Sequence, residues 1–324
     1  MMGKTPVAIS AAAALATVLA GCTSGATTGA GGDVPGNDVA LVLGTTGSPF
    51  YEALSCGAKV KARELKLNLD VSAANAFAAD AQIPIINAVT AARPAAAAVV
   101  PTDAQALIPP LRQLARGGTK LVTVDQTLAD TGMLKSQVVT DNLAGGGMAA
   151  DEVNRLTGGH GKVLVVTQPP GSTAQDQRTK GFEQKLGGYP GLEYLGPQYQ
   201  SNDPQKAAQI VTATVAAHPD LAAIFATNDQ GSIGVVTGLQ QAHAVGRVKV
   251  VAYDAATAQV NALKNGSIQA LIAQNPTEQG EVAMETVRRL LDGEKVEPVI
   301  TTELVTIREG ENAKADQYEY KASC

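Results

Sequence analysis

The chain has 324 residues, of which 45% are hydrophobic and 17% are charged, and its formal net charge is −5. This composition is typical of a globular protein with one large domain or two of ordinary size. The acidic balance leaves no basic surface for phosphates, so nucleic acid is not an expected partner. The absence of Trp and the 3% aromatic content argue against a carbohydrate-hydrolysing cleft with several stacking rings.

The beginning of the chain has the layout of a secretory signal peptide. Lys4 supplies a short positive region, residues 7–18 are almost wholly apolar, and Leu19-Ala20-Gly21-Cys22 follows directly. This end resembles the lipobox of bacterial lipoproteins, in which cleavage before the cysteine leaves that residue to carry the lipid. A plain signal peptide or a membrane anchor is the alternative, but so short a run cannot cross a hydrocarbon core of about 30 Å. We therefore predict a signal peptide over 1–21 and lipid anchoring through Cys22 on the outer face of the bacterial cell membrane.

The residues after Cys22 are mostly Gly, Thr, Ser and Ala, which predicts a flexible tether over 22–37. Cys56 and Cys324 then remain as an even pair in an oxidising compartment, and they are a disulfide candidate. Two buried free thiols are the alternative. We favour the bond because the last residue is a poor place to bury a thiol. The polar tail over 311–323 predicts weak structure that frays unless such a bond holds it.

From residue 38 onward, short apolar β-rich runs alternate with longer amphipathic runs. The first half predicts strands at 39–45, 67–73, 96–101, 120–125 and 137–140, and helices at 49–65, 79–92, 104–116 and 143–156. The second half predicts strands at 162–167, 192–199, 222–226, 249–253 and 270–273, and helices at 173–186, 204–218, 232–242, 256–265 and 277–292. Capping residues support these boundaries, as where Asp203 precedes Pro204 at a helix start.

Apolar strands that are each followed by a helix predict parallel sheets covered on both faces. Because a series of about ten such units is too long for one open sheet, we predict an α/β fold of two doubly wound, Rossmann-like lobes. A (β/α)₈ barrel is the alternative, but nothing marks a single closed ring. We expect lobes of 38–140 plus 276–300 and of 141–275 plus 301–324, the second with a final strand at 301–306. Three hinge crossings near 141, 275 and 300 would join them.

Ligands of open α/β sheets bind beyond the carboxyl ends of the strands. The residues at these points are Gly47, Ser48, Phe50, Tyr51, Asp103, Asp125, Gln126, Gln168, Asn228, Asp229, Asp254, Gln274 and Asn275. They include no histidine, no nucleophile with a base and no cluster of metal ligands, so we predict no catalytic residue, metal or cofactor. Carboxylates and carboxamides suit a neutral polyhydroxylated ligand. Helix capping is the alternative for Asp103, Asp125 and Asp229.

A family resemblance favours ligand binding. SPFY at 48–51, VDQ at 124–126, FATND at 225–229, AYD at 252–254 and IAQ at 272–274 occur in this order, with GST at 171–173 and RTKGF at 178–182. Together they resemble the ribose-type periplasmic binding proteins, the sugar-capturing subunits of ABC importers, over nearly the whole chain after its leader. The resemblance implies the type I periplasmic binding fold. It implies a stacking role for Phe50 and Tyr51, and hydrogen bonding to hydroxyls for Asp125, Asn228, Asp254 and Gln274. Ser48, Gln126 and Arg178 complete the candidate ligand-binding set.

The chain departs from this family at two positions. The family often has arginine where this chain has Gln126 and Asp176, although Arg178 lies close by. Arginines there bind ring oxygen and hydroxyls with a fixed fork of donors. Their loss implies an altered ligand, such as a furanose, a deoxy sugar or an acyclic polyol, and makes an ordinary pyranose pentose doubtful.

We therefore predict a monomeric solute-binding lipoprotein that captures a small neutral sugar or polyol between its lobes and delivers it to an ABC permease in the membrane. A sensory lipoprotein of the same fold, signalling to a membrane receptor, is the alternative, because function is set by sites and not by the fold. A secreted enzyme is a third class. It would require a nucleophile–base pair that the sequence does not show.

Overall fold

The computed structural model describes residues 36–321 and Cys324. The predicted signal peptide over 1–21, the predicted lipid-bearing Cys22 and all but the end of the tether over 22–37 lie outside the described residues. Among the helices of the described part, none has the length and apolarity that a membrane crossing requires.

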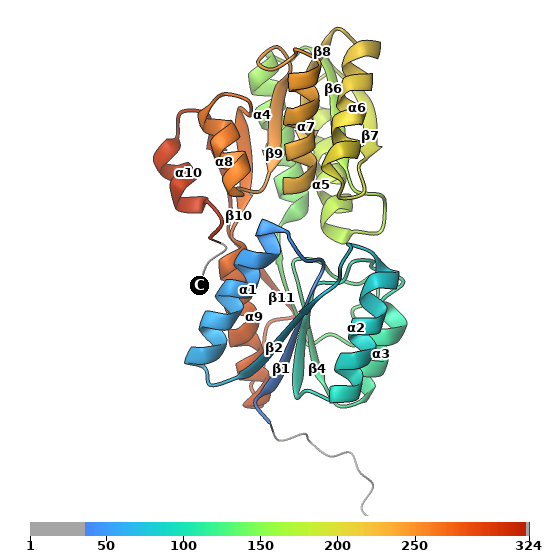
Figure 1. Cartoon of the computed structure of the whole chain (residues 1–324), viewed down its shortest axis with the longest axis vertical. Coiled ribbons are helices and arrows are strands. Elements are labelled where there is room, and N and C mark those ends of the chain that lie inside the picture. Colours follow the sequence, from blue (N-terminus) through green and yellow to red (C-terminus); the bar gives the residue numbers. More distant parts are fainter. Residues whose placement is uncertain (1–35, 322–323) are drawn as a thin grey trace, which may run out of the picture. The chain divides into compact units, whose positions relative to one another are not determined.

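Ten of the strands form two parallel sheets of similar order, and two late strands extend them (Figure 1). The first sheet has the order β11-β5-β4-β3-β1-β2. Its strands are β1 (Asp38–Leu43), β2 (Asn68–Ala73), β3 (Ala96–Val99), β4 (Lys120–Val124), β5 (Ser136–Thr140) and β11 (Val299–Thr302). The second has the order β12-β10-β9-β8-β6-β7, in which only β12 is antiparallel to its neighbour. Its strands are β6 (Gly161–Thr167), β7 (Leu192–Tyr199), β8 (Leu221–Ala226), β9 (Lys249–Tyr253), β10 (Ala270–Gln274) and β12 (Leu304–Arg308).

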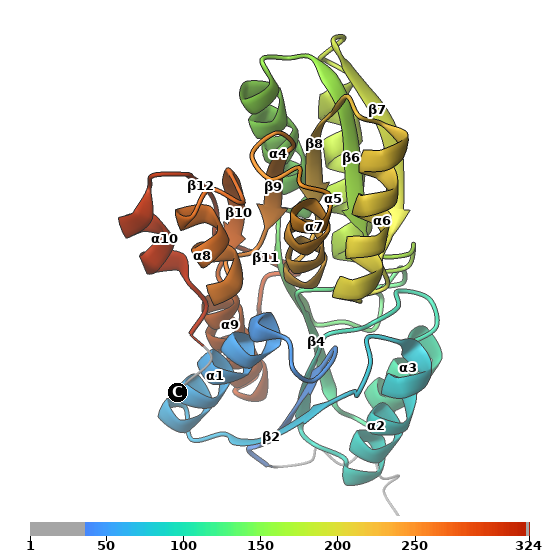
Figure 2. The same ribbon diagram turned by 45° about the horizontal axis from the view of Figure 1, so that its top comes forward.

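Helices cover both faces of each sheet (Figure 2). The first lobe is the first sheet with α1 (Pro49–Glu64), α2 (Ala79–Ala92), α3 (Ile108–Arg116) and α9 (Pro276–Leu291). The second lobe is the second sheet with α4 (Asn142–Thr157), α5 (Thr173–Leu186), α6 (Pro204–Ala217), α7 (Asp229–Gln241), α8 (Thr257–Lys264) and α10 (Asn312–Tyr318). The predicted α/β fold of two doubly wound lobes is confirmed.

The strand pattern explains why both faces are covered. Successive side chains of a strand point to opposite faces, and β1 is apolar at every position from Val39 to Leu43. Leu41 joins the core that includes Leu54 of α1, whereas Val42 joins the core that includes Ile86 of α2. A strand that is apolar on both sides can be buried only between two layers of helices.

The last crossing between the lobes differs from the expected one. The sequence predicts a single strand at 301–306 in the second lobe, but this prediction is wrong. Thr301 and Thr302 pair with β5 in the first sheet, and the chain from Leu304 onward pairs with β10 in the second. One extended run serves both sheets, and only Glu303 separates the two strands. No Gly, Pro, Asn or Asp lies between residues 299 and 308, so the sequence contains no turn signal at this boundary.

The polar tail is also more structured than its sequence predicts. It forms α10, and Ala315 and Tyr320 are buried. Lys264 of α8 forms an ion pair with Asp316, which ties this short helix to the second lobe. The structure also joins Cys56 of α1 and Cys324, the expected disulfide pair, whose Cα atoms are 5.3 Å apart.

Each lobe contains two helices that approach closely at glycines. In the second lobe, a β-carbon on Gly146 of α4 would overlap the carbonyl oxygen of Arg178 on α5. In the first lobe, a β-carbon on Gly280 of α9 would overlap the carbonyl oxygen of Leu54 on α1. Both α4 and α9 directly follow a crossing between the lobes. This close packing fixes each of them to its own lobe.

Candidate functional site

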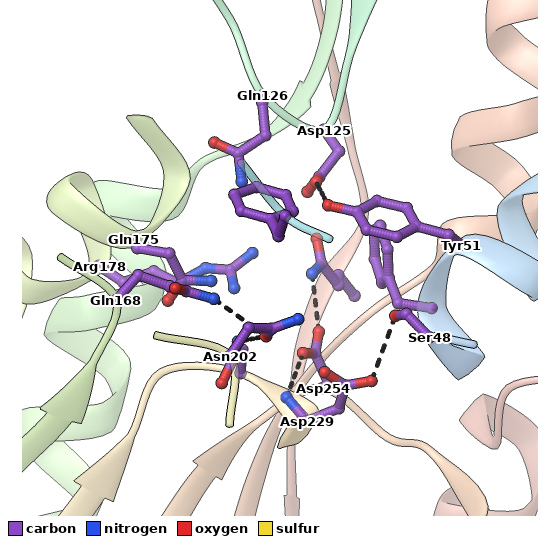
Figure 3. Close-up of a pocket in the computed structure, with 14 residues that line it drawn as sticks. Ser48, Tyr51, Asp125, Gln126, Gln168, Gln175, Arg178, Asn202, Asp229 and Asp254 are labelled. Atoms are coloured by element: carbon purple, nitrogen blue, oxygen red, sulfur yellow. Dashed lines mark hydrogen bonds between the residues drawn. The ribbon is translucent and has the colours of Figure 1, made fainter. Parts of the chain in front are cut away.

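A cavity lies at the carboxyl ends of the strands and is lined by both lobes (Figure 3). All nine residues that the sequence analysis selects for ligand binding line it: Ser48, Phe50, Tyr51, Asp125, Gln126, Arg178, Asn228, Asp254 and Gln274. Five further residues complete the lining: Phe77, Gln168, Gln175, Asn202 and Asp229. These residues lie together because parallel strands end at the same edge of a sheet and bring their following loops together.

Aromatic rings form one wall in the first lobe. Phe50 and Tyr51 lie in the first turn of α1 and pack edge to face, with centroids 5.2 Å apart. Tyr51 also stacks parallel to Phe77, with centroids 6.4 Å apart and an interplanar angle of 4°. Such rings can cover the apolar C–H face of a ligand, and they lie beside the polar groups described next.

Asp125 directly follows β4 and turns its carboxylate into the cavity. Its backbone φ of 64° is in the left-handed region, which Asp tolerates better than most residues. The hydroxyl of Tyr51 donates to its Oδ2 at 3.2 Å. Burial raises the pKa of the Asp125 carboxyl to about 6, although the attraction of Arg178 opposes this rise. The side chain does not cap a helix, so ligand binding is the interpretation that the geometry favours for Asp125.

Asp103 has the alternative role. Its Oδ1 accepts from the backbone N–H groups of Gln105 and Ala106 at 2.8 and 2.7 Å, and it does not line the cavity. It therefore caps a turn, as one of the two interpretations predicts. The regular helix α3 begins only at Ile108, later than the predicted residue 104.

Asp254 is the most extensively hydrogen-bonded acidic residue of the second-lobe wall. The Gln274 amide donates to its Oδ1 at 2.7 Å, and the Tyr320 hydroxyl donates to the same atom at 2.9 Å. The backbone N–H of Asp229 donates to its Oδ2 at 3.0 Å. The Oε1 of Gln274 in turn accepts from the Thr140 hydroxyl at 3.1 Å, which joins this group to the end of β5 in the first lobe.

Asn228 and Asp229 combine capping with a position in the cavity. The Oδ1 of Asn228 accepts from the Gly231 N–H at 2.9 Å and caps α7, while its amide group donates to Asn202 at 2.9 Å. The hydroxyl of Ser48, from the first lobe, donates to Asp229 Oδ2 at 3.4 Å. Burial and the nearby Asp254 carboxylate raise the pKa of Asp229 to about 7. The alternatives of cap and ligand contact are therefore not exclusive at this helix start.

Arg178 of α5 is the cation of the cavity, and it is 2% exposed. Its Nε donates to Asn142 Oδ1 and its Nη1 to the Thr227 carbonyl, each at 2.8 Å. The guanidinium carbon lies 3.7 Å from the centre of the Tyr253 ring, a cation–π contact. Its Nη2 is buried and has no hydrogen-bond partner among the described residues. A buried donor without a partner is costly, so this atom is a candidate for contact with a ligand.

At position 176, where the resemblance leads one to expect an arginine, the cavity instead has a guanidinium from a neighbouring residue. Asp176 does not line the cavity, and its carboxylate accepts from the Gly171 N–H at 3.0 Å instead. Arg178, two residues later, supplies the guanidinium. The loss at Gln126 is a real difference, because its Oε1 accepts from the Ala174 N–H at 2.9 Å and is used for a contact between the lobes.

Five lining residues lie outside the nine selected ones, and three of these, Phe77, Gln175 and Asn202, are also absent from the strand-end residues. Phe77 and Asn202 follow β2 and β7, the edge strands, so the rule of strand ends extended to edge strands would have found them. Gln175 lies one helical turn before Arg178, where i and i+3 share a face. Gln168 and Asp229 are among the strand-end residues, although not among the nine.

The lining groups are hydrogen-bond donors, acceptors and ring faces. Among residues 36–321 and Cys324, no three His, Cys, Asp or Glu side chains are grouped so that they could hold a metal ion. The arrangement suits recognition of a ligand by directed hydrogen bonds.

Comparison with known proteins agrees with this geometry. Residues 39–295 match the model of the periplasmic binding protein domain. The chain is 30% identical over 271 residues to the ribose import binding protein of Haemophilus influenzae, covering 84% of this chain and 91% of that protein. An ABC transporter solute-binding protein from Agrobacterium vitis, bound with α-D-tagatopyranose, has a TM-score of 0.85 at 32% identity and covers 88% of this chain and 99% of its own. With two doubly wound lobes and a cavity that both lobes line, the chain belongs to the periplasmic binding protein family.

Proposed function

We propose that the protein is the extracytoplasmic binding component of an ABC importer and that it binds a small neutral sugar or polyol. The main support for this proposal is that one buried cavity combines carboxylate acceptors, an Arg178 donor without a partner and aromatic rings. Asp125 and Asp229 can accept from ligand hydroxyls, and Arg178 Nη2 can donate to a hydroxyl or ring oxygen. The Tyr51 and Phe77 rings can cover the C–H face.

The charges of the cavity support a ligand without an anionic group. Asp125, Asp229 and Asp254 face a single guanidinium. An anionic ligand would meet three buried carboxylates, and like charges repel strongly at buried positions. Hydroxyl groups avoid this repulsion because they donate to carboxylates.

The position of Gln126 supports the altered ligand that the sequence suggests. Its side-chain oxygen is occupied by the N-terminal turn of α5, so Arg178 is the one guanidinium that lines the cavity. Fewer forked donors favour a furanose, a deoxy sugar or an acyclic polyol over an ordinary pyranose pentose.

Delivery to a permease and lipid anchoring complete the proposal. The relatives described above are binding proteins of importers, which favours import over the sensory alternative and over an enzyme. Closure of the two lobes on the ligand is the expected motion, since hinge closure is common in such proteins. We further propose export by the signal peptide over 1–21, lipid anchoring at Cys22 and a monomeric state.

A thermal-shift screen of the chain from Cys22 onward tests the ligand class. The panel should contain D-ribose, D-tagatose, deoxy sugars, furanose-forming ketoses and polyols such as xylitol, with anionic sugar acids as the contrast. A ligand at 100 times its Kd stabilises the folded state by about 2.7 kcal/mol, and we expect this only among neutral compounds. Stabilisation by sugar acids alone would reject the proposal. Mass spectrometry of membrane-extracted protein, against Cys22→Ala, tests lipid anchoring.

A further inference from the structure

The C-terminal segment passes from the second lobe to the first (Figures 1 and 2). Lys314 of α10 donates to the Thr306 carbonyl of β12 at 2.7 Å, and the Tyr320 N–H donates to the Ala255 carbonyl at 3.1 Å. Both contacts lie in the second lobe. Four residues after Tyr320, Cys324 is bonded to Cys56 of α1 in the first lobe. The chain therefore makes a fourth connection between the lobes, and this one is closed by a covalent bond.

Tyr320 touches one cavity residue from each lobe. It is 6% exposed, and its ring meets Phe50 of the first lobe with centroids 5.9 Å apart at 69°. Its hydroxyl donates to Asp254 Oδ1 of the second lobe at 2.9 Å. Tyr320 is not among the residues that line the cavity. Tyr320 therefore contacts the lining residues Phe50 and Asp254 without lining the cavity itself.

Asp254 depends on such support. Its φ of 84° is unusual for a residue other than glycine and persists only where neighbouring groups hold it. Tyr320 and Gln274 are the two donors to Oδ1, and the Asp229 N–H is the donor to Oδ2. Without the Tyr320 hydroxyl, Oδ1 retains one donor, and the carboxylate is held less firmly in its orientation toward the cavity. Tyr320 is therefore a positioning residue for Asp254.

The disulfide also limits how far the lobes can separate. Four residues of extended chain span at most about 14 Å, and the Cα atoms of the two cysteines are 5.3 Å apart. Tyr320 thus cannot lie more than about 20 Å from Cys56 while the bond exists. During hinge opening, Cys56 moves with the first lobe and Asp254 with the second. An opening wider than this tether allows is then either prevented by the tail or draws Tyr320 away from Asp254.

We propose that Tyr320 and the Cys56–Cys324 disulfide form a strap that completes the binding site from outside the cavity. Tyr320 orients Asp254, and the disulfide keeps Tyr320 in place and holds the ligand-free lobes near their closed arrangement. A protein that is already near its bound arrangement loses less free energy on binding, so the oxidised protein binds more tightly than the reduced one. This inference rests on the proposed function only for its effect on affinity.

The first test uses no ligand. Small-angle scattering compares the wild type with Cys56→Ser/Cys324→Ser, after circular dichroism has shown that both are folded. We expect a larger radius of gyration for the double variant, and the same increase in the wild type after addition of reductant. Reductant should not change the double variant, which serves as the control. Equal scattering of oxidised wild type and double variant overturns the strap.

The second test separates the hydroxyl from the fold. Amide hydrogen exchange at Asp254 and Ala255 should be faster in Tyr320→Phe, which keeps the ring against Phe50, than in the matched control Tyr318→Phe on α10. Affinity for xylitol, the acyclic polyol of the screening panel, is measured by calorimetry. It should fall about tenfold in Tyr320→Phe and in the cysteine double variant, and less than additively in the triple variant. Unchanged exchange in Tyr320→Phe contradicts the positioning role. If xylitol fails to bind the wild type, that result concerns only the proposed function, and exchange and scattering still decide the strap.

Discussion

The side-chain oxygen of Gln126 accepts a hydrogen bond of 2.9 Å from the backbone N–H of Ala174, which belongs to the opposite lobe. The hydroxyls of Thr173 and Ser172 donate to the same atom at 3.1 and 3.3 Å. Helix α5 begins here without a cap from its own Ser172 side chain. The first lobe therefore caps a helix of the second, and this contact requires the lobes to be close together.

Replacement of Gln126 tests this cap between the lobes. Gln126→Met keeps the size of the side chain and removes the acceptor, and loss of a cap costs about 1 kcal/mol. We expect about fivefold weaker binding of a ligand found by the screen. Gln126→Arg should be weaker still, because it places a cation at the positive end of the α5 dipole. Calorimetry measures both, and wild-type affinity in Gln126→Met would show that the contact does not stabilise closure.

Arg178 should be essential for binding. Arg178→Met removes the donor that faces the cavity and leaves the Asn142 and Thr227 oxygens without their partner. Loss of a charged hydrogen bond together with an uncompensated carboxylate should weaken binding more than a hundredfold, or about 3 kcal/mol. Lys185→Met, an exposed change on the same helix, is the control. If Arg178→Met binds the ligand with nearly wild-type affinity, the ligand does not bind in this cavity.

Asp254 is the acceptor to test in the second lobe. Asp254→Asn suits the left-handed backbone at this position and removes the charge, whereas Asp254→Ala would also add strain. Loss of a charged acceptor costs about 1.5–3 kcal/mol, or roughly a 10- to 150-fold loss of affinity. Asp203→Asn replaces one good helix cap with another at α6, away from the cavity, and should bind like the wild type. Full affinity of Asp254→Asn would mean that the site is misplaced.

Binding should weaken as the pH falls below about 7, because the pKa of Asp229 is raised to about 7 and that of Asp125 to about 6. A ligand hydroxyl donates to the ionised carboxylate, so protonation removes its preferred acceptor. In the ligand-free protein the sign is opposite. A raised pKa stabilises the fold below about pH 4, and this contribution is lost as the pH rises to about 7.

Calorimetry and thermal unfolding between pH 4 and 8 check both effects. Asp229→Asn is the control, because it should retain only the pH dependence that Asp125 causes below about 6. Affinity of the wild type that is constant between pH 5 and 8 would contradict a ligand contact at these carboxylates.

The α4–α5 contact should not tolerate a side chain. Gly146→Ala places a methyl group against the Arg178 carbonyl oxygen, and overpacking of this kind costs about 1–3 kcal/mol. The neighbouring Gly147→Ala is the matched control, since its β-carbon would meet no atom closer than 3.9 Å, and Ala favours the helix by up to about 1 kcal/mol. Chemical unfolding should therefore give a higher free energy of unfolding for Gly147→Ala than for Gly146→Ala. The reverse order would mean that the helices separate at little cost.

The sequence predicts the sheets and most of the cavity because both depend on local patterns. The apolar runs at β1 and β8 show their burial directly, and Asp125 and Asp254 follow strands that the pattern marks clearly. The rule of strand ends then brings residues together that lie more than a hundred positions apart.

The tail and the roles of single side chains depend on long-range contacts and could not be read in this way. Tyr320 reaches Asp254 across 66 positions, and nothing in its own neighbourhood distinguishes it from Tyr318. Helix α10 is too short and polar to be marked by periodicity, and it exists because Asp316 and Ala315 find partners in the second lobe. The cap that Gln126 provides likewise requires a helix from the other lobe.

The glycine contacts and the cavity residues constrain the evolution of this sequence in two different ways. Gly57, Gly146, Gly181 and Gly280 tie the helices to their lobes through backbone contacts, and none of them lines the cavity. The residues that line the cavity lie in loops, at the end of β10 and in the first two turns of helices. Substitutions at the cavity can therefore alter ligand preference without disturbing the helix contacts at these glycines, which hold each lobe together during closure. Selection for a different ligand would act on the cavity-lining residues. The four glycines would remain unchanged and preserve the movement of the lobes.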